Sequence, residues 1–234
     1  MSFGNRTVIV TGAAGNLGKA VGQAFAELGA NLVLVDLKRE ALENAFGPES
    51  DRRLVVPANL LQTADATALA QAALACFGRI DVLCNITGGF RMGETVHETS
   101  DENWNFLFDI NTRTLLHAVR AVVPHMLAAG GGKIVNVGAF AAQKGVAQMG
   151  AYTASKSTVI RMTEAMAAEL REKNINVNCV LPTIIDTPEN RSAMPKANPA
   201  KWVAPADLAN VIVFLASDAA RAVHGAAVPV TGLS

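Results

Sequence analysis

The sequence contains little tyrosine and cysteine and no excess of charge of either sign. One tyrosine and three cysteines occur in 234 residues, and 20 Lys and Arg balance 20 Asp and Glu. Nucleic acids and anionic membranes are bound through an excess of basic side chains, so the balanced charge argues against both as partners. The cysteines and the four histidines are scattered without metal-type spacing. We therefore expect free thiols in a reducing cytoplasm, and no metal site.

Long apolar runs are also missing. No segment reaches the roughly 18 consecutive apolar residues of a membrane span, and residues 1–6 lack the apolar core of a secretory signal. Half of the residues are nonetheless hydrophobic and only 17% are charged, which is typical of a folded protein with a sizeable core. We expect a cytoplasmic protein in which residues 1–234 form one domain.

Short β-branched runs alternate with longer helical patterns along the chain. Several runs are apolar almost throughout, as expected of strands covered on both faces. This alternation predicts right-handed crossovers and a doubly wound α/β fold, with helices on both faces of a mostly parallel sheet of about seven strands. The predicted strands are Thr7–Val10, Asn31–Val35, Arg53–Val56, Val82–Cys84, Lys133–Val137, Asn176–Leu181 and Ala227–Val230.

Helix boundaries are also readable. Apolar side chains recur at helical spacing between residues 17 and 28 and are followed by Gly29, a typical residue after a helix. Thr99 and Glu102 have the spacing of a capping box, which predicts a long helix that begins there and runs to the glycines at 130–132.

A glycine-rich segment, residues 11–18, joins the first strand directly to the first helix. Glycines here let the backbone turn sharply and approach a pyrophosphate, which then lies at the positive N-terminus of the helix. A glycine triplet alone is a weak signal, but its place between a strand and a helix is the context that the motif requires. The segment predicts dinucleotide contacts at Gly12, Gly15, Asn16, Leu17 and Gly18.

Asp36 ends the second predicted strand, at the distance beyond the glycines where an acid meets the adenosine ribose. Its carboxylate accepts hydrogen bonds from ribose hydroxyls and repels a 2′-phosphate, so we expect NAD to be preferred over NADP. Lys38 and Arg39 follow closely and would partly offset that repulsion.

These features resemble the short-chain dehydrogenase/reductase family over essentially the whole chain. The resemblance implies a Rossmann-type fold and an oxidoreductase that transfers a hydride between a nicotinamide cofactor and a small carbonyl, alcohol or quinonoid substrate. The motifs occur in the family's order and spacing: the glycine-rich segment, Asp36, Asn85-x-x-Gly88, Asn111 and Tyr152-x-x-x-Lys156.

The resemblance assigns the remaining cofactor contacts. Residues 59–60 match a pair beside the adenine, with asparagine in place of the family's acid. Residues 182–187 resemble the Pro-Gly stretch beside the nicotinamide, and Thr187 fits a partner for the carboxamide or phosphate. The further positions implied are Asn59, Leu60, Asn85, Thr87, Tyr152, Lys156, Pro182, Ile185 and Thr187.

Tyr152 and Lys156 also suit acid–base chemistry on physical grounds. They are four residues apart at the start of a predicted helix and therefore share a face. A free tyrosine has a pKa near 10, and a nearby lysine cation is expected to lower it toward the working range. By resemblance, Lys156 also holds the nicotinamide ribose, and Asn111 supports a proton relay.

The chain departs from the family pattern at a further position, where it lacks the family's serine. That serine stands thirteen positions before the tyrosine, where this chain has Ala139, and no serine or threonine occurs from 138 through 150. Losing one such donor to the substrate oxygen typically costs about 10²–10³ in rate, or roughly 2.7–4 kcal/mol.

Three hypotheses account for Ala139. The substrate needs little polarisation, as a quinonoid or imine-like ring does; dihydropteridine reductases, which also have alanines there, are similar on this point. Alternatively, Gln143 or Thr183 replaces the hydroxyl. In the third hypothesis, the protein binds NAD without turnover and acts as a regulatory or scaffold protein.

The substrate side and the assembly are inferred last. Four prolines between residues 186 and 205 preclude one long helix there, and the family uses this region as a substrate lid. The two longest predicted helices, 101–129 and 151–172, pair across subunits in the family, which implies a homodimer or homotetramer. Their apolar residues Leu115, Val119, Val122, Met162 and Met166 suit either such an interface or the core.

Overall fold

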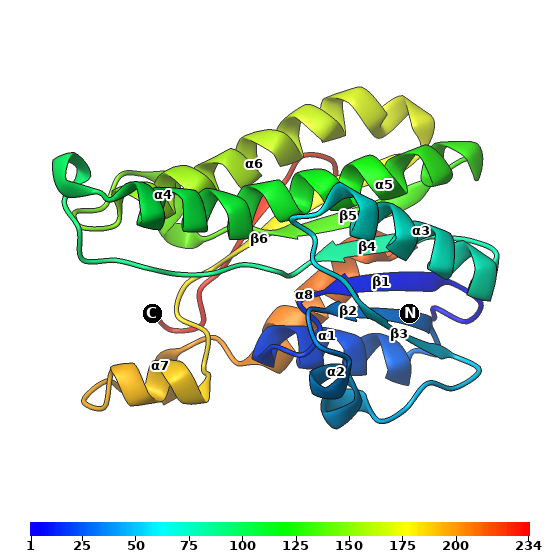
Figure 1. Cartoon of the computed structure of the whole chain (residues 1–234), viewed down its shortest axis with the longest axis horizontal. Helices are drawn as coiled ribbons and strands as arrows, with labels where there is room; N and C mark the ends of the chain where they lie inside the picture. Colours follow the sequence, from blue (N-terminus) through cyan, green and yellow to red (C-terminus); the bar gives the residue numbers. More distant parts are fainter.

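The computed structural model describes all 234 residues and is built around one seven-stranded sheet (Figure 1). All strand pairs are parallel, so the expected mostly parallel sheet is in fact entirely parallel, and the order is β3-β2-β1-β4-β5-β6-β7. Each of the seven predicted strands is confirmed to within a residue or two. The strands are β1 (Thr7–Thr11), β2 (Asn31–Asp36), β3 (Arg53–Pro57), β4 (Val82–Asn85), β5 (Gly132–Val137), β6 (Ile175–Pro182) and β7 (Ala227–Val230).

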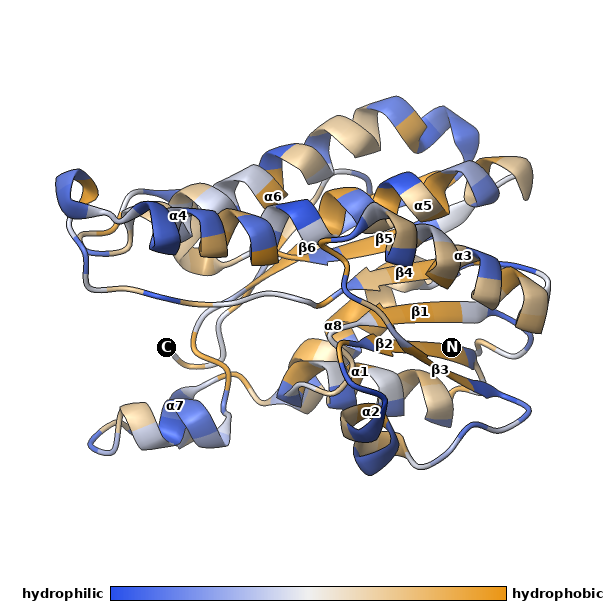
Figure 2. Ribbon diagram, viewed as in Figure 1, coloured by the Kyte–Doolittle hydropathy of each residue, from blue (hydrophilic) through white to orange (hydrophobic).

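Helices cover both faces of the sheet, as expected (Figure 1). One face carries α1 (Asn16–Glu27), α2 (Arg39–Phe46) and α8 (Pro205–Ala216); the other carries α3 (Thr63–Phe77), α4 (Asp101–Phe108), α5 (Thr114–Ala128) and α6 (Gly150–Leu170). The strands are hydrophobic along their length, whereas the outer sides of the helices are polar (Figure 2). Two buried clusters of 24 and 23 residues, one on each face, hold the layers together through apolar burial.

The predicted long helix is interrupted. Residues Asp109–Arg113 form a π-helical turn between α4 and α5. Such turns are frequently found at functional sites, and this one contains the predicted site residue Asn111. The sequence pattern predicted one continuous helix, whereas the structure has α4, this π-helical turn and α5 in its place.

The predicted capping box was wrong by one residue. Ser100, rather than Thr99, caps α4, because its Oγ accepts a hydrogen bond from the Asn103 backbone N–H at 3.2 Å. Thr99 instead donates to the Thr95 carbonyl at 3.0 Å and closes the preceding 3₁₀ turn. Glu94 supplies the reciprocal acid, accepting from the Ser100 N–H at 3.1 Å. A capping carboxylate contributed by a loop leaves no spacing signature in the helix itself.

The prolines of residues 186–205 do exclude one long helix. Pro188 and Pro205 are the first residues of the short helix α7 (Pro188–Ala193) and of α8, where a missing N–H costs nothing. Helix α7 buries no side chain and lies away from the sheet in Figure 1, below the edge where the strands end. No helix has both the length and the apolar character needed to cross a bilayer.

Candidate active site

The glycine-rich turn between β1 and α1 can be formed only without side chains at two positions. Gly12 has φ = 63°, in the left-handed region, and a Cβ there would lie 3.0 Å from the Thr87 backbone. A Cβ on Gly18 would lie 2.1 Å from the Gly12 carbonyl oxygen. The turn is also joined to the loop after β4, because the Thr11 hydroxyl accepts from the N–H groups of Ile86 and Thr87 at 3.1 and 3.2 Å.

A pocket of about 290 Å³ opens beside this turn, between the carboxyl ends of β1, β2 and β4. The strand order reverses between β1 and β4, which is where doubly wound sheets bind ligands. Six of the predicted cofactor residues line it: Gly12, Gly15, Asp36, Asn59, Leu60 and Thr87. Gly88 of the Asn85-x-x-Gly88 motif lines it too. No sequence motif marked the other lining residues, which are Val35, Leu37, Ala58, Leu61, Ile110 and Thr114.

Asp36 is the only charged residue that lines the pocket. One of its carboxylate oxygens accepts from the Ala14 N–H at 3.0 Å and the other from the Leu37 N–H at 2.8 Å. Lys38 and Arg39 were expected to offset its charge in part. Arg39 is occupied elsewhere, since it pairs with Glu43 and Glu49, each at 3.3 Å, whereas Lys38 is exposed and does not line the pocket. The pocket therefore presents a fixed negative charge with no lining cation.

Other predicted cofactor residues of the first half of the chain contact the protein itself. The Asn85 amide donates to Asn136 Oδ1 at 2.8 Å across the sheet, and its own oxygen is buried without a partner. Leu17 is buried in the core on the α1 face. Asn16 donates to the Glu189 carboxylate at 2.8 Å and so joins the start of α1 to α7.

Tyr152 and Lys156 lie on the first two turns of α6. The Tyr152 hydroxyl makes no hydrogen bond to the protein and is not fully buried, whereas Lys156 is 5% exposed and its Nζ donates to the Val137 carbonyl at 2.8 Å. Burial raises the pKa of Tyr152 to about 12, because it disfavours the phenolate, and burial lowers the pKa of Lys156 to about 8. The expected lowering of the tyrosine pKa by its lysine is therefore not found in this geometry, because Lys156 bonds to a strand carbonyl and desolvation dominates.

Asn111 joins the π-helical turn to two other segments. Its side chain accepts from the Gly89 N–H at 2.9 Å and donates to the Gly89 carbonyl at 3.0 Å. The same amide donates to the Ser155 hydroxyl at 3.1 Å. A Cβ on Gly88 would lie 3.0 Å from both Asn111 Oδ1 and Lys156 Nζ. The structure thus brings Asn111 and Lys156 together around one glycine.

Ala139 lies just after the end of β5 and is 4% exposed. It belongs to a small apolar cluster against which Tyr152 packs. Neither candidate replacement for a serine hydroxyl is aimed at Tyr152: Gln143 donates to the Phe140 carbonyl at 3.3 Å, and Thr183 bonds to Thr231 at 3.0 Å. Their side chains are committed to local contacts that the sequence does not reveal.

The segment after β6 supplies the remaining predicted residues. Pro182 ends β6, and Ile185 forms a bridge with Val203. The Thr187 hydroxyl caps α7 by accepting from the Asn190 N–H at 3.2 Å. Arg191, on α7, is paired with Asp186 at 2.6 Å.

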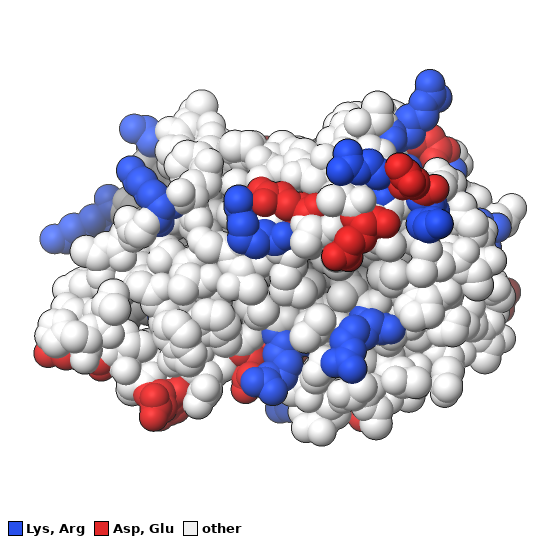
Figure 3. Space-filling view, turned by 90° about the horizontal axis from the view of Figure 1, so that it is seen from above, with Lys and Arg blue, Asp and Glu red and all other residues white.

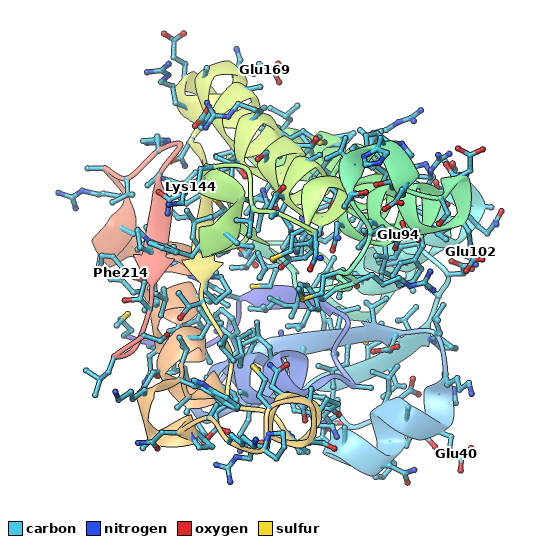
Figure 4. All side chains as sticks on the ribbon, turned by 90° about the vertical axis from the view of Figure 1, so that its left-hand side faces the viewer. Glu40, Glu94, Glu102, Lys144, Glu169 and Phe214 are labelled. Carbon is cyan, nitrogen blue, oxygen red and sulfur yellow. The ribbon has the colours of Figure 1, made fainter.

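The residues fit a nicotinamide dinucleotide. The glycine turn leaves a cradle that a Cβ would fill, the adjoining pocket holds a carboxylate and apolar walls, and Tyr152 and Lys156 lie beyond it along the same edge. Figure 4 looks onto this edge, with Glu94 on the side of α4 and Lys144 beside the end of β6. No group of three or more metal-ligating side chains is present.

Known proteins resemble the chain over nearly its whole length. The family profile described as Enoyl-(Acyl carrier protein) reductase matches residues 12–232. The D-threitol dehydrogenase of Mycolicibacterium smegmatis is 33% identical, covering 97% of this chain and 92% of the relative. Among solved structures, 3-ketoacyl-(acyl-carrier-protein) reductase from Brucella melitensis, complexed with NADH, has a TM-score of 0.88 at 28% identity, covering 99% of this chain and 98% of its own. Carveol dehydrogenase from Mycobacterium avium, in complex with NAD, has a TM-score of 0.88 at 26% identity, covering 98% and 97%.

Proposed function

The chain belongs to the short-chain dehydrogenase/reductase family of NAD(P)-dependent enzymes that act on small alcohols and carbonyls, and on that basis we propose that it is an NADH-preferring reductase with Tyr152 as its general acid. The observation that carries this proposal is the free hydroxyl of the only tyrosine, which lies one helical turn from a buried lysine at the carboxyl edge of the sheet.

The chemistry divides between cofactor and protein. The bound nicotinamide supplies or accepts the hydride. Tyr152 donates the proton that the substrate oxygen or nitrogen takes up, and because burial raises its pKa to about 12, it stays protonated at neutral pH and is ready to act as an acid. Lys156 would hold the nicotinamide ribose, and Asn111 fixes the Gly88–Gly89 backbone beside both groups.

The cofactor preference rests on Asp36. A 2′-phosphate in the pocket of about 290 Å³ would meet this carboxylate with no cation among the lining residues. We expect kcat/KM to be about 5- to 30-fold higher with NADH than with NADPH, because one such repulsion is worth on the order of 1–2 kcal/mol. Cofactor consumption with a panel of ketones, quinones and a quinonoid dihydropterin measures both the preference and the substrate class.

Asp36→Asn is the matched variant for this preference, because it keeps the shape and removes the charge. This variant should reduce the ratio of kcat/KM with NADH to kcat/KM with NADPH. Equal use of NADPH by the wild type would contradict the assignment of Asp36 to the ribose, while leaving reductase activity itself intact.

A second function is favoured by one observation, the apolar surroundings of Tyr152 around Ala139. In this alternative the protein binds NADH and does not turn over, acting as a regulatory or scaffold protein. Micromolar NADH binding without consumption of cofactor on any compound of the panel would favour it over the reductase.

We also propose that the chain forms a homo-oligomer. Leu115, Val119, Val122 and Met166 are buried in the core, so they are not the interface. The outer sides of α4 and α5 instead expose Trp104, Leu116 and Leu127, and the view onto the helical face in Figure 3 shows charges of both signs, sparse and interspersed. Sedimentation equilibrium should give a mass of two or four chains, and a mass near the 24.4 kDa of one chain would overturn the proposal.

A further inference from the structure

An exposed aromatic ring lies directly against Tyr152. The ring centroids of Phe90 and Tyr152 are 4.8 Å apart and the planes are nearly perpendicular, at 86°. Phe90 lies in the loop after β4. Despite its contact with Tyr152, its side chain remains 54% exposed. A large apolar side chain that stays half in solvent beside a reactive hydroxyl offers its free surface to whatever approaches that hydroxyl.

The backbone on both sides of Phe90 is fixed. Gly89 exchanges two hydrogen bonds with the Asn111 side chain, at 2.9 and 3.0 Å. On the other side, the Arg91 guanidinium lies 3.9 Å from the centre of the Phe106 ring. Two residues further on, the Gly93 N–H donates to the Gln148 carbonyl at 2.8 Å. Phe90 is therefore held in place and is not a mobile loop residue.

The remaining surroundings of the Tyr152 hydroxyl offer no side-chain hydrogen bond. Tyr152 packs against the cluster that contains Ala139 and Ala142, and the next residue along, Phe140, is 40% exposed. A polyhydroxylated substrate depends on side-chain donors and acceptors for orientation, and the cluster against which Tyr152 packs consists of apolar side chains. Apolar contact is the means of orientation that this part of the site provides.

We propose that Phe90 is a specificity-determining residue, whose exposed ring packs against a flat, largely apolar ring of the substrate and directs its carbonyl or imine to Tyr152. This inference rests on the proposed reductase function and narrows it to ring-bearing substrates over open-chain polyols. The ring contact takes over part of the orientation that a hydroxyl at position 139 would give.

Steady-state kinetics of the NADH-loaded enzyme with cyclohexanone and with dihydroxyacetone tests the proposal. Phe90→Ala should lower kcat/KM for cyclohexanone by about tenfold, the size of one lost aromatic contact, mainly through KM. Activity on dihydroxyacetone and the Kd of NADH should change less than twofold. Phe90→Leu should recover part of the loss. Phe214→Ala is the control, because Phe214 is another exposed phenylalanine, at 40%, and it lies on α8, which covers the other face of the sheet from α6 and Tyr152 (Figure 4).

Equal losses of kcat/KM on both compounds would overturn the proposal, because Phe90 would then only support Tyr152. An unchanged kcat/KM on both compounds would also overturn it. The affinity of cyclohexanone for the NADH complex, titrated by ligand-observed NMR, separates this inference from the proposed function. If the wild type turned over neither these two compounds nor any member of the panel, the reductase proposal would fail. A tenfold weaker affinity in Phe90→Ala would still support the ring contact, and an unchanged affinity would overturn it.

Discussion

Replacing Tyr152 with phenylalanine is expected to lower kcat/KM for carbonyl reduction by about 10²–10⁴-fold, the usual contribution of a positioned general acid. The substitution removes only the hydroxyl, which bonds to nothing in the protein, and keeps the ring that packs against Phe90. NADH affinity and the thermal unfolding temperature should therefore stay within experimental error of the wild type. Stopped-flow or steady-state loss of NADH absorbance measures the change.

Thr153→Val is the matched control for Tyr152→Phe. It removes a neighbouring hydroxyl on the same helix, and that hydroxyl donates back to the Met149 carbonyl at 2.9 Å. Activity should be retained in this control. If kcat/KM of Tyr152→Phe were within tenfold of the wild-type value, another group would have to supply the proton.

The pH dependence follows from the same group. Reduction needs the protonated phenol, and burial raises the pKa of Tyr152 to about 12, so reduction is expected to use an acid that is present throughout the neutral range. Alcohol oxidation needs the phenolate and should rise with increasing pH. Burial lowers the pKa of Lys156 to about 8, so the side chain loses its positive charge as the pH rises above that value. Its binding of the cofactor should weaken accordingly. The ratio of oxidation to reduction should thus increase with pH.

Introducing a hydroxyl at position 139 is expected to raise kcat/KM for simple ketones by about 10²-fold, the lower end of the range for one donor at a developing oxyanion. Ala139 has an extended backbone, with φ = −156° and ψ = 143°, and packs in the cluster that contacts Tyr152. A serine fits this extended backbone without strain, and it would place a hydroxyl in the cluster against which Tyr152 packs. The assay is NADH consumption by Ala139→Ser with unactivated ketones.

Ala142→Ser is the control for this gain. Ala142 belongs to the same cluster and is equally buried, at 5%, but it lies in the 3₁₀ turn after the strand end. It should gain nothing. Ala139→Ser could leave kcat/KM for simple ketones unchanged while the wild type reduces a quinonoid ring. That result would mean that the natural substrate needs no polarisation of its oxygen or nitrogen by a side-chain donor. No turnover in either protein would favour the non-catalytic alternative.

The fold was predictable because its signals are local. Each strand is a short apolar run, and the glycines at positions 12 and 18 mark a turn that no side chain can occupy. Parallel strands with buried helices between them have few alternative arrangements, so the order of elements determines most of the topology. The capping of α4 was not predictable, because Glu94 acts from a loop outside the helix.

The candidate site was predictable in its residue types and less so in its contacts. Asp36, Asn59 and Thr87 were predicted from motif positions, and they line one pocket. Phe90 carried no signal, since an aromatic residue after two glycines is ordinary in sequence. Its contact with Tyr152 arises only when the loop after β4 meets the first turn of α6.

By itself, the sequence determined the α/β architecture, the glycine turn between β1 and α1 and the placement of Tyr152 and Lys156 on one helix, because each depends on neighbours within a few residues. Only the tertiary structure decided the electrostatics. Burial, which is set by the packing of distant segments, raises the tyrosine pKa and lowers that of the lysine, and the Lys156 Nζ donates to the Val137 carbonyl. Desolvation depends on everything that surrounds a group, and the order of residues along a chain does not record it.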